Sequence, residues 1–158
     1  MFLIDKALPL LKESGISYWL GRGVLGDFLE NGELKCAHSD VDFHVWGKDQ
    51  EILKKIMNPV FDNDKFKKID EKHKLAFEKT SNGTVFLLEF MYLFDDENVG
   101  YVYHISCNKK CVCPKYCFPK NGGKTKKIGN RNIPIPSNIE EYFSQVYKNN
   151  QWREKYKN

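Results

Sequence analysis

The sequence has no apolar run that approaches the roughly 20 residues of a membrane-spanning helix, so a protein anchored by such helices is not expected. It has no internal repeat and no stretch of linker composition, and we therefore expect residues 1–158 to form one domain with a single core. Disorder is excluded because 41% of the residues are hydrophobic and 14% are aromatic. Residues 1–15 mix Asp5, Lys6 and Pro9 with apolar residues, which is typical of an amphipathic helix and not of a signal peptide. A cytoplasmic, reducing compartment is therefore expected.

Acidic residues are missing from one part of the chain, residues 101–131, which carries seven lysines and one arginine. The other residues carry 17 basic and 21 acidic side chains, a net charge of −4. A basic segment beside an acidic body favours an anionic ligand on that side. A solvated, lysine-rich loop explains the same composition, and the sequence leaves both interpretations open.

Hydrophobic periodicity predicts an α+β fold in which helices flank a mixed β-sheet. The expected helices cover residues 2–13, 23–32, 49–61 with a stop near Pro59, and a last helix capped by Ser137 or Asn138. The expected strands cover residues 16–23, 39–46, 65–72, 74–80, 84–94 and 99–107. Asn82-Gly83 predicts a tight hairpin turn. The segment 107–131 is expected to be an irregular, cysteine- and lysine-rich loop.

Two carboxylates stand one residue apart in the sequence HSDVDFHVW, residues 38–46. Side chains alternate between the faces of a strand, so Asp40, Asp42 and His44 should share one face while the intervening residues face the core. Two carboxylates about 7 Å apart repel each other, and a hard divalent cation, Mg²⁺ or Mn²⁺, commonly offsets such repulsion. His44 could contact a substrate or the metal. The alternative is that the aspartates are only the exposed face of an edge strand.

Glu89 is the only charged residue within TVFLLEFMYLF, residues 84–94. A carboxylate in a buried strand is unfavourable unless it is paired or binds a metal. If this strand lies beside the aspartate strand, Glu89 can complete a three-carboxylate site for one or two metal ions, which would orient a nucleophile and neutralise charge on a phosphate during transfer. The alternative is that Glu89 pairs with a lysine.

The sequence GRGVLGDF, residues 21–28, places glycines between an expected strand and an expected helix. Gly21 and Gly23 would let the backbone approach a phosphate at the helix N-terminus, and Arg22 could bind the same phosphate through two hydrogen bonds. The alternative is a tight turn whose glycines serve packing only.

Residues 18–46 resemble the LicD/fukutin group of the nucleotidyltransferase superfamily, which shows a glycine turn, a small helix and then a D-x-D strand. A closing signature of that group is similar to this chain at Pro136, Glu141, Tyr142, Phe143, Tyr147 and Trp152. Departures also occur, since Ser39-Asp40 instead resembles the SD-x-D of antibiotic-modifying nucleotidyltransferases, and Lys148 stands where a glycine is usual.

The resemblance implies a nucleotidyltransferase-like fold and an enzyme that moves a phosphate-linked group, of the phosphocholine or sugar-alcohol phosphate type. The donor would be nucleotide-activated (CDP- or NTP-type), and the acceptor a hydroxyl of a glycan or small molecule. Asp40 and Asp42 would bind Mg²⁺, and Glu89 would complete the site or act as the base. The implied substrate contacts are Gly21, Arg22, Gly23, Ser39 and His44. An alternative is a nucleotidyltransferase that adds a nucleotide to a small-molecule hydroxyl.

Four cysteines, Cys107, Cys111, Cys113 and Cys117, follow the spacing C-x3-C-x-C-x3-C. Four thiolates in a short loop could bind a structural Zn²⁺, although the usual C-x2-C pairs are absent. Ordinary cysteines, two in a strand and two in a loop, are the alternative. A basic loop held by zinc could also serve a nucleic-acid-binding module. We do not expect nucleic acid as the partner, because that function leaves the aspartate pair and Glu89 unexplained.

Overall fold

The computed structural model describes residues 2–31, 40–120 and 123–147. Four α-helices lie within these ranges: α1 (Phe2–Ser14), α2 (Arg22–Asn31), α3 (Gln50–Asn63) and α4 (Ile139–Val146). The strands are β1 (Tyr18–Gly21), β2 (Asp40–Trp46), β3 (Lys67–Glu71), β4 (Lys74–Ser81), β5 (Thr84–Asp95), β6 (Tyr101–Ser106), β7 (Lys109–Pro114), β8 (Thr125–Ile128) and β9 (Arg131–Pro134). None of the helices in the described ranges has the length and apolar character needed to span a membrane.

Strands β1 to β7 form the mixed sheet that the sequence predicts, and β8 and β9 form a separate two-stranded sheet. The main path of the mixed sheet runs β1-β2-β5-β4-β3, and the hairpin of β6 and β7 extends it from the far end of β5. Strands β2 and β5 are parallel, while the other pairs of the sheet are antiparallel. A parallel pair needs a crossover, and the chain between β2 and β5 supplies it with α3, β3 and β4. This pairing places the aspartate strand directly beside the strand that carries Glu89.

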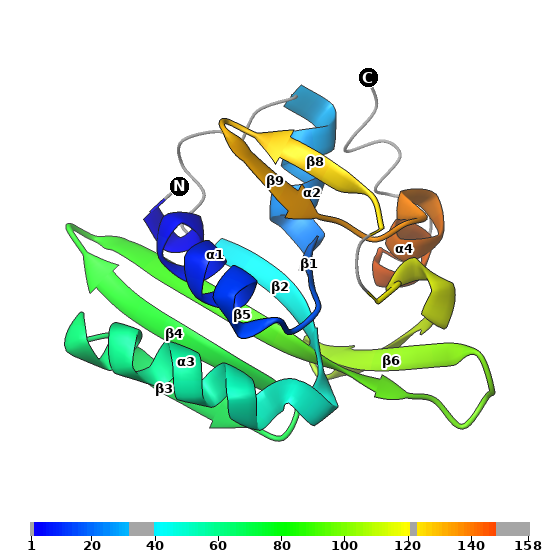
Figure 1. The fold of residues 1–158 in the computed structure, drawn as a ribbon, viewed down its shortest axis with the longest axis horizontal. Coiled ribbons are helices and arrows are strands. Elements are labelled where there is room, and N and C mark those ends of the chain that lie inside the picture. The colour runs from blue at the N-terminus through cyan, green and yellow to red at the C-terminus, as the bar shows by residue number, and fades with distance from the viewer. Residues whose placement is uncertain (1, 32–39, 121–122, 148–158) are drawn as a thin grey trace.

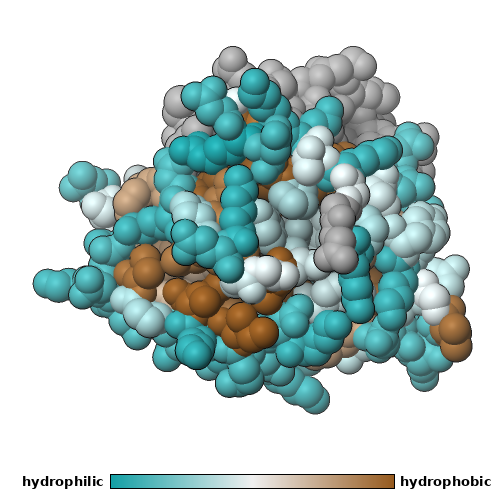
Figure 2. Space-filling view, in the orientation of Figure 1, coloured by the Kyte–Doolittle hydropathy of each residue, from teal (hydrophilic) through white to brown (hydrophobic). Residues whose placement is uncertain are grey.

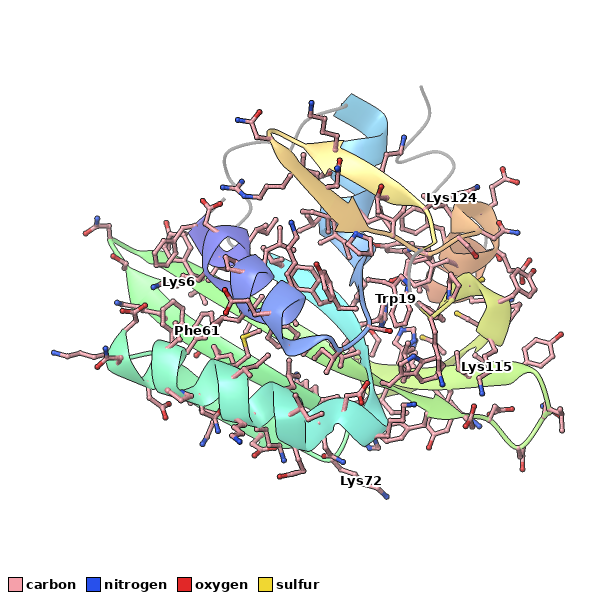
Figure 3. The ribbon with its side chains drawn as sticks, viewed as in Figure 1. Lys6, Trp19, Phe61, Lys72, Lys115 and Lys124 are labelled. Atoms are coloured by element: carbon pink, nitrogen blue, oxygen red, sulfur yellow. The ribbon has the colours of Figure 1, made fainter. Side chains whose placement is uncertain are left out.

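Helices α1 and α3 pack side by side over one face of the sheet (Figure 1). Their apolar side chains meet the aromatic residues of the strands: Phe61 from α3 stacks on Phe77 from β4, with ring centroids 4.5 Å apart. Figure 3 shows Trp19 and Phe61 within the body of the molecule, while Lys72 and Lys124 lie on the outside. Figure 2 shows, in the same view, that apolar surface is exposed among polar side chains over these two helices. Phe2 in α1 and Ile52 in α3 are large apolar residues that are exposed.

The sequence predicted that helix α3 stops near Pro59. In the structure the helix continues to Asn63. Proline removes one backbone hydrogen bond, to the carbonyl four residues earlier, here that of Lys55. Both Pro59 and Lys55 are exposed, so water can satisfy that carbonyl. Phe61 is fully buried beyond the proline and holds the last turn against the sheet. The burial of Phe61 therefore outweighs the tendency of Pro59 to end the helix.

The sequence predicted an irregular loop over residues 107–131, and this prediction is wrong. Residues 109–114 pair with β6 as strand β7, and residues 125–128 pair with β9 as strand β8. Cys107 and Asn108 make the β6–β7 turn with φ of 50° and 59°, the left-handed values of a type I′ hairpin turn. Neither residue is glycine, which removed the usual turn signal from the sequence.

Several basic side chains of the segment 101–131 are paired with acids of the body. Lys110 pairs with Asp96 at 2.6 Å, Lys115 pairs with Asp95 at 2.7 Å, and Arg131 pairs with Asp5. These contacts support the solvated-loop interpretation for part of the segment, because a paired lysine has less positive charge to offer an anionic ligand.

Candidate functional site

A pocket of about 490 Å³ opens where β1 ends and α2 begins. Its charged side chains come from α2, β2, β4 and β5, and they are Arg22, Asp27, Asp40, Asp42, Lys74 and Glu89. The parallel register of β2 and β5 sets Asp42 directly opposite Glu89. Asp40, Asp42 and Glu89, which the sequence singled out separately, therefore face one cavity. Glu89 is not turned away from the aspartates.

Asp42 has an unfavourable electrostatic environment. Only 7% of its surface is exposed, whereas Asp40 at the start of the strand is exposed to solvent. Burial, together with the smaller effects of the negative charges of Asp40 and Glu89, raises the pKa of Asp42 from its usual 3.8 to about 8. Arg22 and Lys74 act in the opposite direction without cancelling the shift. The pocket thus has too little positive charge to keep all its carboxylates ionised.

Glu89 meets both interpretations that the sequence allowed, because it lines the pocket and also pairs with a lysine. The ammonium group of Lys74 lies 2.9 Å from a carboxylate oxygen of Glu89. Sequence reasoning missed this lysine. A signal was nevertheless present: the two-residue turn at Asn82-Gly83 aligns Ala76 with Glu89, and this register makes Lys74 the diagonal cross-strand neighbour of Glu89.

Arg22 stands between the carboxylates and the β6–β7 hairpin. Its guanidinium donates to the sulfur of Cys107 at 3.7 Å. Burial acts to lower the pKa of Arg22, but the negative charge of Asp42 and the contact with Cys107 more than offset it, so the pKa is raised and the cation is retained. The backbone of Arg22 has a φ of +53°, a left-handed conformation that is uncommon outside glycine. An arginine held this way beside acids can bind a phosphate.

His44 does not line the pocket, contrary to the expectation that it contacts substrate or metal. It is fully buried beneath the site, and its Nε2 lies 2.7 Å from the hydroxyl of Tyr142 in α4. The alternation of β2 does place His44 on the same face as Asp42, but Tyr142 of α4, together with His104 and Phe118, packs against His44 there. The other face is covered too, so β2 is buried on both sides after Asp40.

Gly21 does not line the pocket either, because it lies in β1 and packs under Tyr142. A β-carbon at this position would lie 2.7 Å from the hydroxyl of Tyr142 and 2.8 Å from Nε2 of His44. Gly23 does line the pocket, and a β-carbon there would meet nothing within 4 Å. The two glycines, which look alike in the sequence, thus have different roles.

His104 stacks edge-on against His44, with ring centroids 4.6 Å apart. Neither of its ring nitrogens has a hydrogen-bond partner among the described residues. Burial, and then the positive charge of Arg22, lower the pKa of His104 from 6.5 to about 4. Both histidines are therefore neutral near pH 7 and form an uncharged layer behind the charged pocket.

The donor atoms of the pocket suit a hard cation such as Mg²⁺ or Mn²⁺, since they are carboxylate oxygens with an excess of negative charge. The raised pKa of Asp42 is the observation that tests this fit: its largest cause is burial, to which Asp40 and Glu89 add repulsion, and a bound divalent cation would offset both effects. As the side chains stand, no three Asp, Glu, His or Cys residues within 2–31, 40–120 and 123–147 are close enough together to hold an ion. Binding would thus require small side-chain movements.

The four cysteines do not form the predicted zinc site in the described structure. Cys107 is exposed at the hairpin tip and lines the pocket, whereas Cys113 and Cys117 are buried under α4. Burial raises the pKa of Cys117 to about 11 and also raises that of Cys113, so both remain protonated thiols that pack as small apolar groups. The arginine contact lowers the pKa of Cys107. Sequence spacing could not show that one cysteine faces the site and two face the core.

Three residues named in the sequence hypotheses, Ser39, Lys148 and Trp152, lie outside the described residues. Tyr147, which belongs to the same closing signature, lines the pocket at the end of α4. Asp27 also lines the pocket from α2 and was missed, because its spacing from the glycine turn carries no distinctive signal.

Comparison with known proteins identifies the fold. No protein-family model matches the chain, and no curated protein sequence matches it. Among solved structures, the lincosamide antibiotic adenylyltransferase LnuA with lincomycin bound matches with 14% identity and a TM-score of 0.59, covering 95% of this chain and 84% of that one. ANT(2'')-Ia in complex with adenylyl-2''-tobramycin matches with 17% identity and a TM-score of 0.58, covering 98% of this chain and 76% of that one. The solution structure of the antibiotic-resistance factor ANT(2'')-Ia matches with 18% identity and a TM-score of 0.56, covering 96% of this chain and 75% of that one.

At these identities the likeness concerns the fold. The predicted nucleotidyltransferase-like α+β fold is confirmed. The resemblance to the LicD/fukutin group finds no support in these comparisons.

Proposed function

We propose that the protein is a metal-dependent nucleotidyltransferase that moves a nucleoside monophosphate from a nucleoside triphosphate to a hydroxyl group of a small molecule. The observation that carries the proposal is the placement of Asp42 opposite Glu89 in one pocket, with Asp40 and Arg22 around them. The similar structures are described as an adenylyltransferase and as a complex with an adenylylated antibiotic, which supports the choice of a nucleotide as the transferred group.

Five of the six charged residues of the pocket have a role in this proposal. Arg22 and the backbone at Gly23 bind the phosphates of the donor. Glu89 faces the acceptor as the general base, and the ammonium group of Lys74 holds its carboxylate in place. Asp40 and Asp42 would hold Mg²⁺, which when bound supplies positive charge against the triphosphate.

In the reaction, the acceptor oxygen attacks the α-phosphorus of the donor. The bond between the α-phosphorus and the bridging oxygen breaks, and pyrophosphate leaves with the electron pair. The acceptor proton passes to the carboxylate of Glu89. Arg22 remains charged throughout because of its raised pKa, and it stabilises the negative charge that shifts toward pyrophosphate.

Mass spectrometry of products tests this function. The protein is incubated with Mg²⁺, an acceptor set that includes tobramycin and lincomycin, and ATP, CTP, GTP or UTP in turn, with pyrophosphate release as a second readout. We expect an acceptor mass increased by one nucleoside monophosphate. Glu89→Gln should lower the rate by roughly 100-fold or more, as for removal of a general base. The same chemical change at exposed Glu97, Glu97→Gln, should leave the rate unchanged.

CDP-choline in a parallel reaction separates the two donor chemistries. Transfer of phosphocholine with release of CMP would overturn nucleotide addition and restore the LicD-like alternative. Absence of pyrophosphate release and of bound nucleotide under all these conditions would contradict both.

A further inference from the structure

The left-handed backbone of Arg22 needs a structural cause. At φ +53° the β-carbon of a residue other than glycine is crowded, so such a conformation persists only where neighbouring groups hold it. The backbone N–H of Arg22 donates to the hydroxyl of Tyr142 at 3.0 Å. This contact joins residues 120 positions apart in the chain and connects the start of α2 with α4.

The hydroxyl of Tyr142 makes two hydrogen bonds. It accepts from the backbone N–H of Arg22, and it shares a second hydrogen bond with Nε2 of His44 at 2.7 Å, whose direction depends on the tautomer of the histidine. Tyr142 and His44 are both completely buried, so water cannot replace either contact.

Gly21 creates the space for this arrangement. Any β-carbon there would lie 2.7 Å from the Tyr142 hydroxyl and displace it. The ring of Tyr142 also packs edge-on against His44 and Phe118, with centroids 5.4 Å and 6.1 Å away. Those ring contacts need no hydroxyl, and phenylalanine would keep them.

We propose that Tyr142 is a positioning residue of the nucleotide site: its hydroxyl, oriented by His44, holds Arg22 in the left-handed conformation that directs the guanidinium into the pocket. The inference rests on the proposed function for the identity of the ligand. It assigns α4 a part in the site, because a hydroxyl on that helix sets the geometry of the phosphate-binding turn.

The Tyr142→Phe variant tests the role with two measurements on the full chain. Titration with ATP, CTP, GTP and UTP in the presence of Mg²⁺ gives the dissociation constants, and amide hydrogen exchange at Arg22 follows the hydrogen bond itself. We expect the dissociation constant of the preferred nucleotide to rise roughly tenfold, as for loss of one hydrogen bond that leaves buried partners unsatisfied. Exchange at Arg22 should become faster.

A matched control is Tyr92→Phe, which removes a buried hydroxyl that has no partner among the described residues and lies outside the pocket. It should leave both measurements unchanged. His44→Gln, which can keep a hydrogen-bonding group near Tyr142, should retain nucleotide affinity better than His44→Leu. A purely structural role would lower the unfolding temperature of Tyr142→Phe without changing nucleotide affinity, and that result would overturn the inference.

The outcomes separate the two proposals. If the wild-type protein binds none of the four nucleotides with Mg²⁺, the proposed function fails and the inference falls with it. If the wild type binds and Tyr142→Phe binds equally well, or if exchange at Arg22 does not change, only the inference fails.

Discussion

Replacing Asp42 with asparagine should stabilise the protein in the absence of metal while removing its proposed activity. The folded protein holds the proton of Asp42 up to about pH 8, whereas the unfolded chain releases it near pH 3.8. Between these values the folded state binds more protons than the unfolded state, so the free energy of unfolding falls as the pH rises. At pH 7 the interval is about 3 pH units, and at 1.36 kcal/mol each the buried carboxyl lowers stability by about 4 kcal/mol.

Asparagine has nearly the same shape as the protonated acid and no charge to bury. The stability difference between Asp42→Asn and the wild type should therefore be close to zero near pH 4 and should increase to about 4 kcal/mol at pH 7. Urea denaturation with EDTA, at several pH values between 4 and 8, measures this difference. Asp62→Asn makes the same chemical change at an exposed position of α3, and it should alter stability by less than about 0.5 kcal/mol at each pH.

Magnesium provides the second part of the test. Adding Mg²⁺ at pH 7 should raise the unfolding free energy of the wild type and leave Asp42→Asn unaffected, because binding needs the ionised carboxylate and is linked to folding by mass action. A stability difference that does not grow with pH would refute the electrostatic reasoning. An equal gain from Mg²⁺ in both proteins would place the metal elsewhere.

Three further predictions concern the neighbours of the site. His104→Leu should reduce the loss of stability on acidification. Because the pKa of His104 is lowered from 6.5 to about 4 in the folded state, the free energy of unfolding of the wild type falls by about 3 kcal/mol as the pH falls through that interval. Urea denaturation at pH 6.5 and at pH 4 measures the difference. Gly21→Ala should destabilise the protein by about 1–3 kcal/mol, since the new methyl group would clash with the hydroxyl of Tyr142. Gly23→Ala, whose methyl group meets open space, should not lower the unfolding temperature, and thermal denaturation of both variants measures the effect. Iodoacetamide should modify Cys107 before the buried cysteines, because it is exposed and the neighbouring guanidinium lowers its pKa; MgATP should slow the reaction, and peptide mass spectrometry locates the product.

Local signals in the sequence predicted much of the fold and part of the site. The strand pattern around Asp40 and Asp42, the lone charge of Glu89 in an apolar run and the Asn82-Gly83 turn each depend on neighbouring residues only, and each appears in the structure as expected. Asn138 caps α4 by accepting from the backbone N–H of Glu141 at 3.1 Å, which is also a local interaction.

The errors arose where distant segments compete with local preferences. The apolar anchor at Phe61 carries α3 past Pro59, and pairing with β9 converts part of the basic loop into a strand. The cysteine spacing indicated a metal, but burial separates Cys107 from Cys117. Residue spacing along the chain contains no information about which side of a loop or strand a later helix will cover.

By itself, the sequence determined which side chains are candidates for the chemistry, since carboxylates, an arginine and a glycine turn follow one another with recognisable spacing on local elements. The tertiary structure alone decided which of them share a pocket. The parallel register of β2 and β5 brings Glu89 beside Asp42, and the packing of α4 buries His44 and places a hydroxyl on Arg22. Those outcomes depend on contacts between residues up to 120 positions apart, which form only when the whole core assembles.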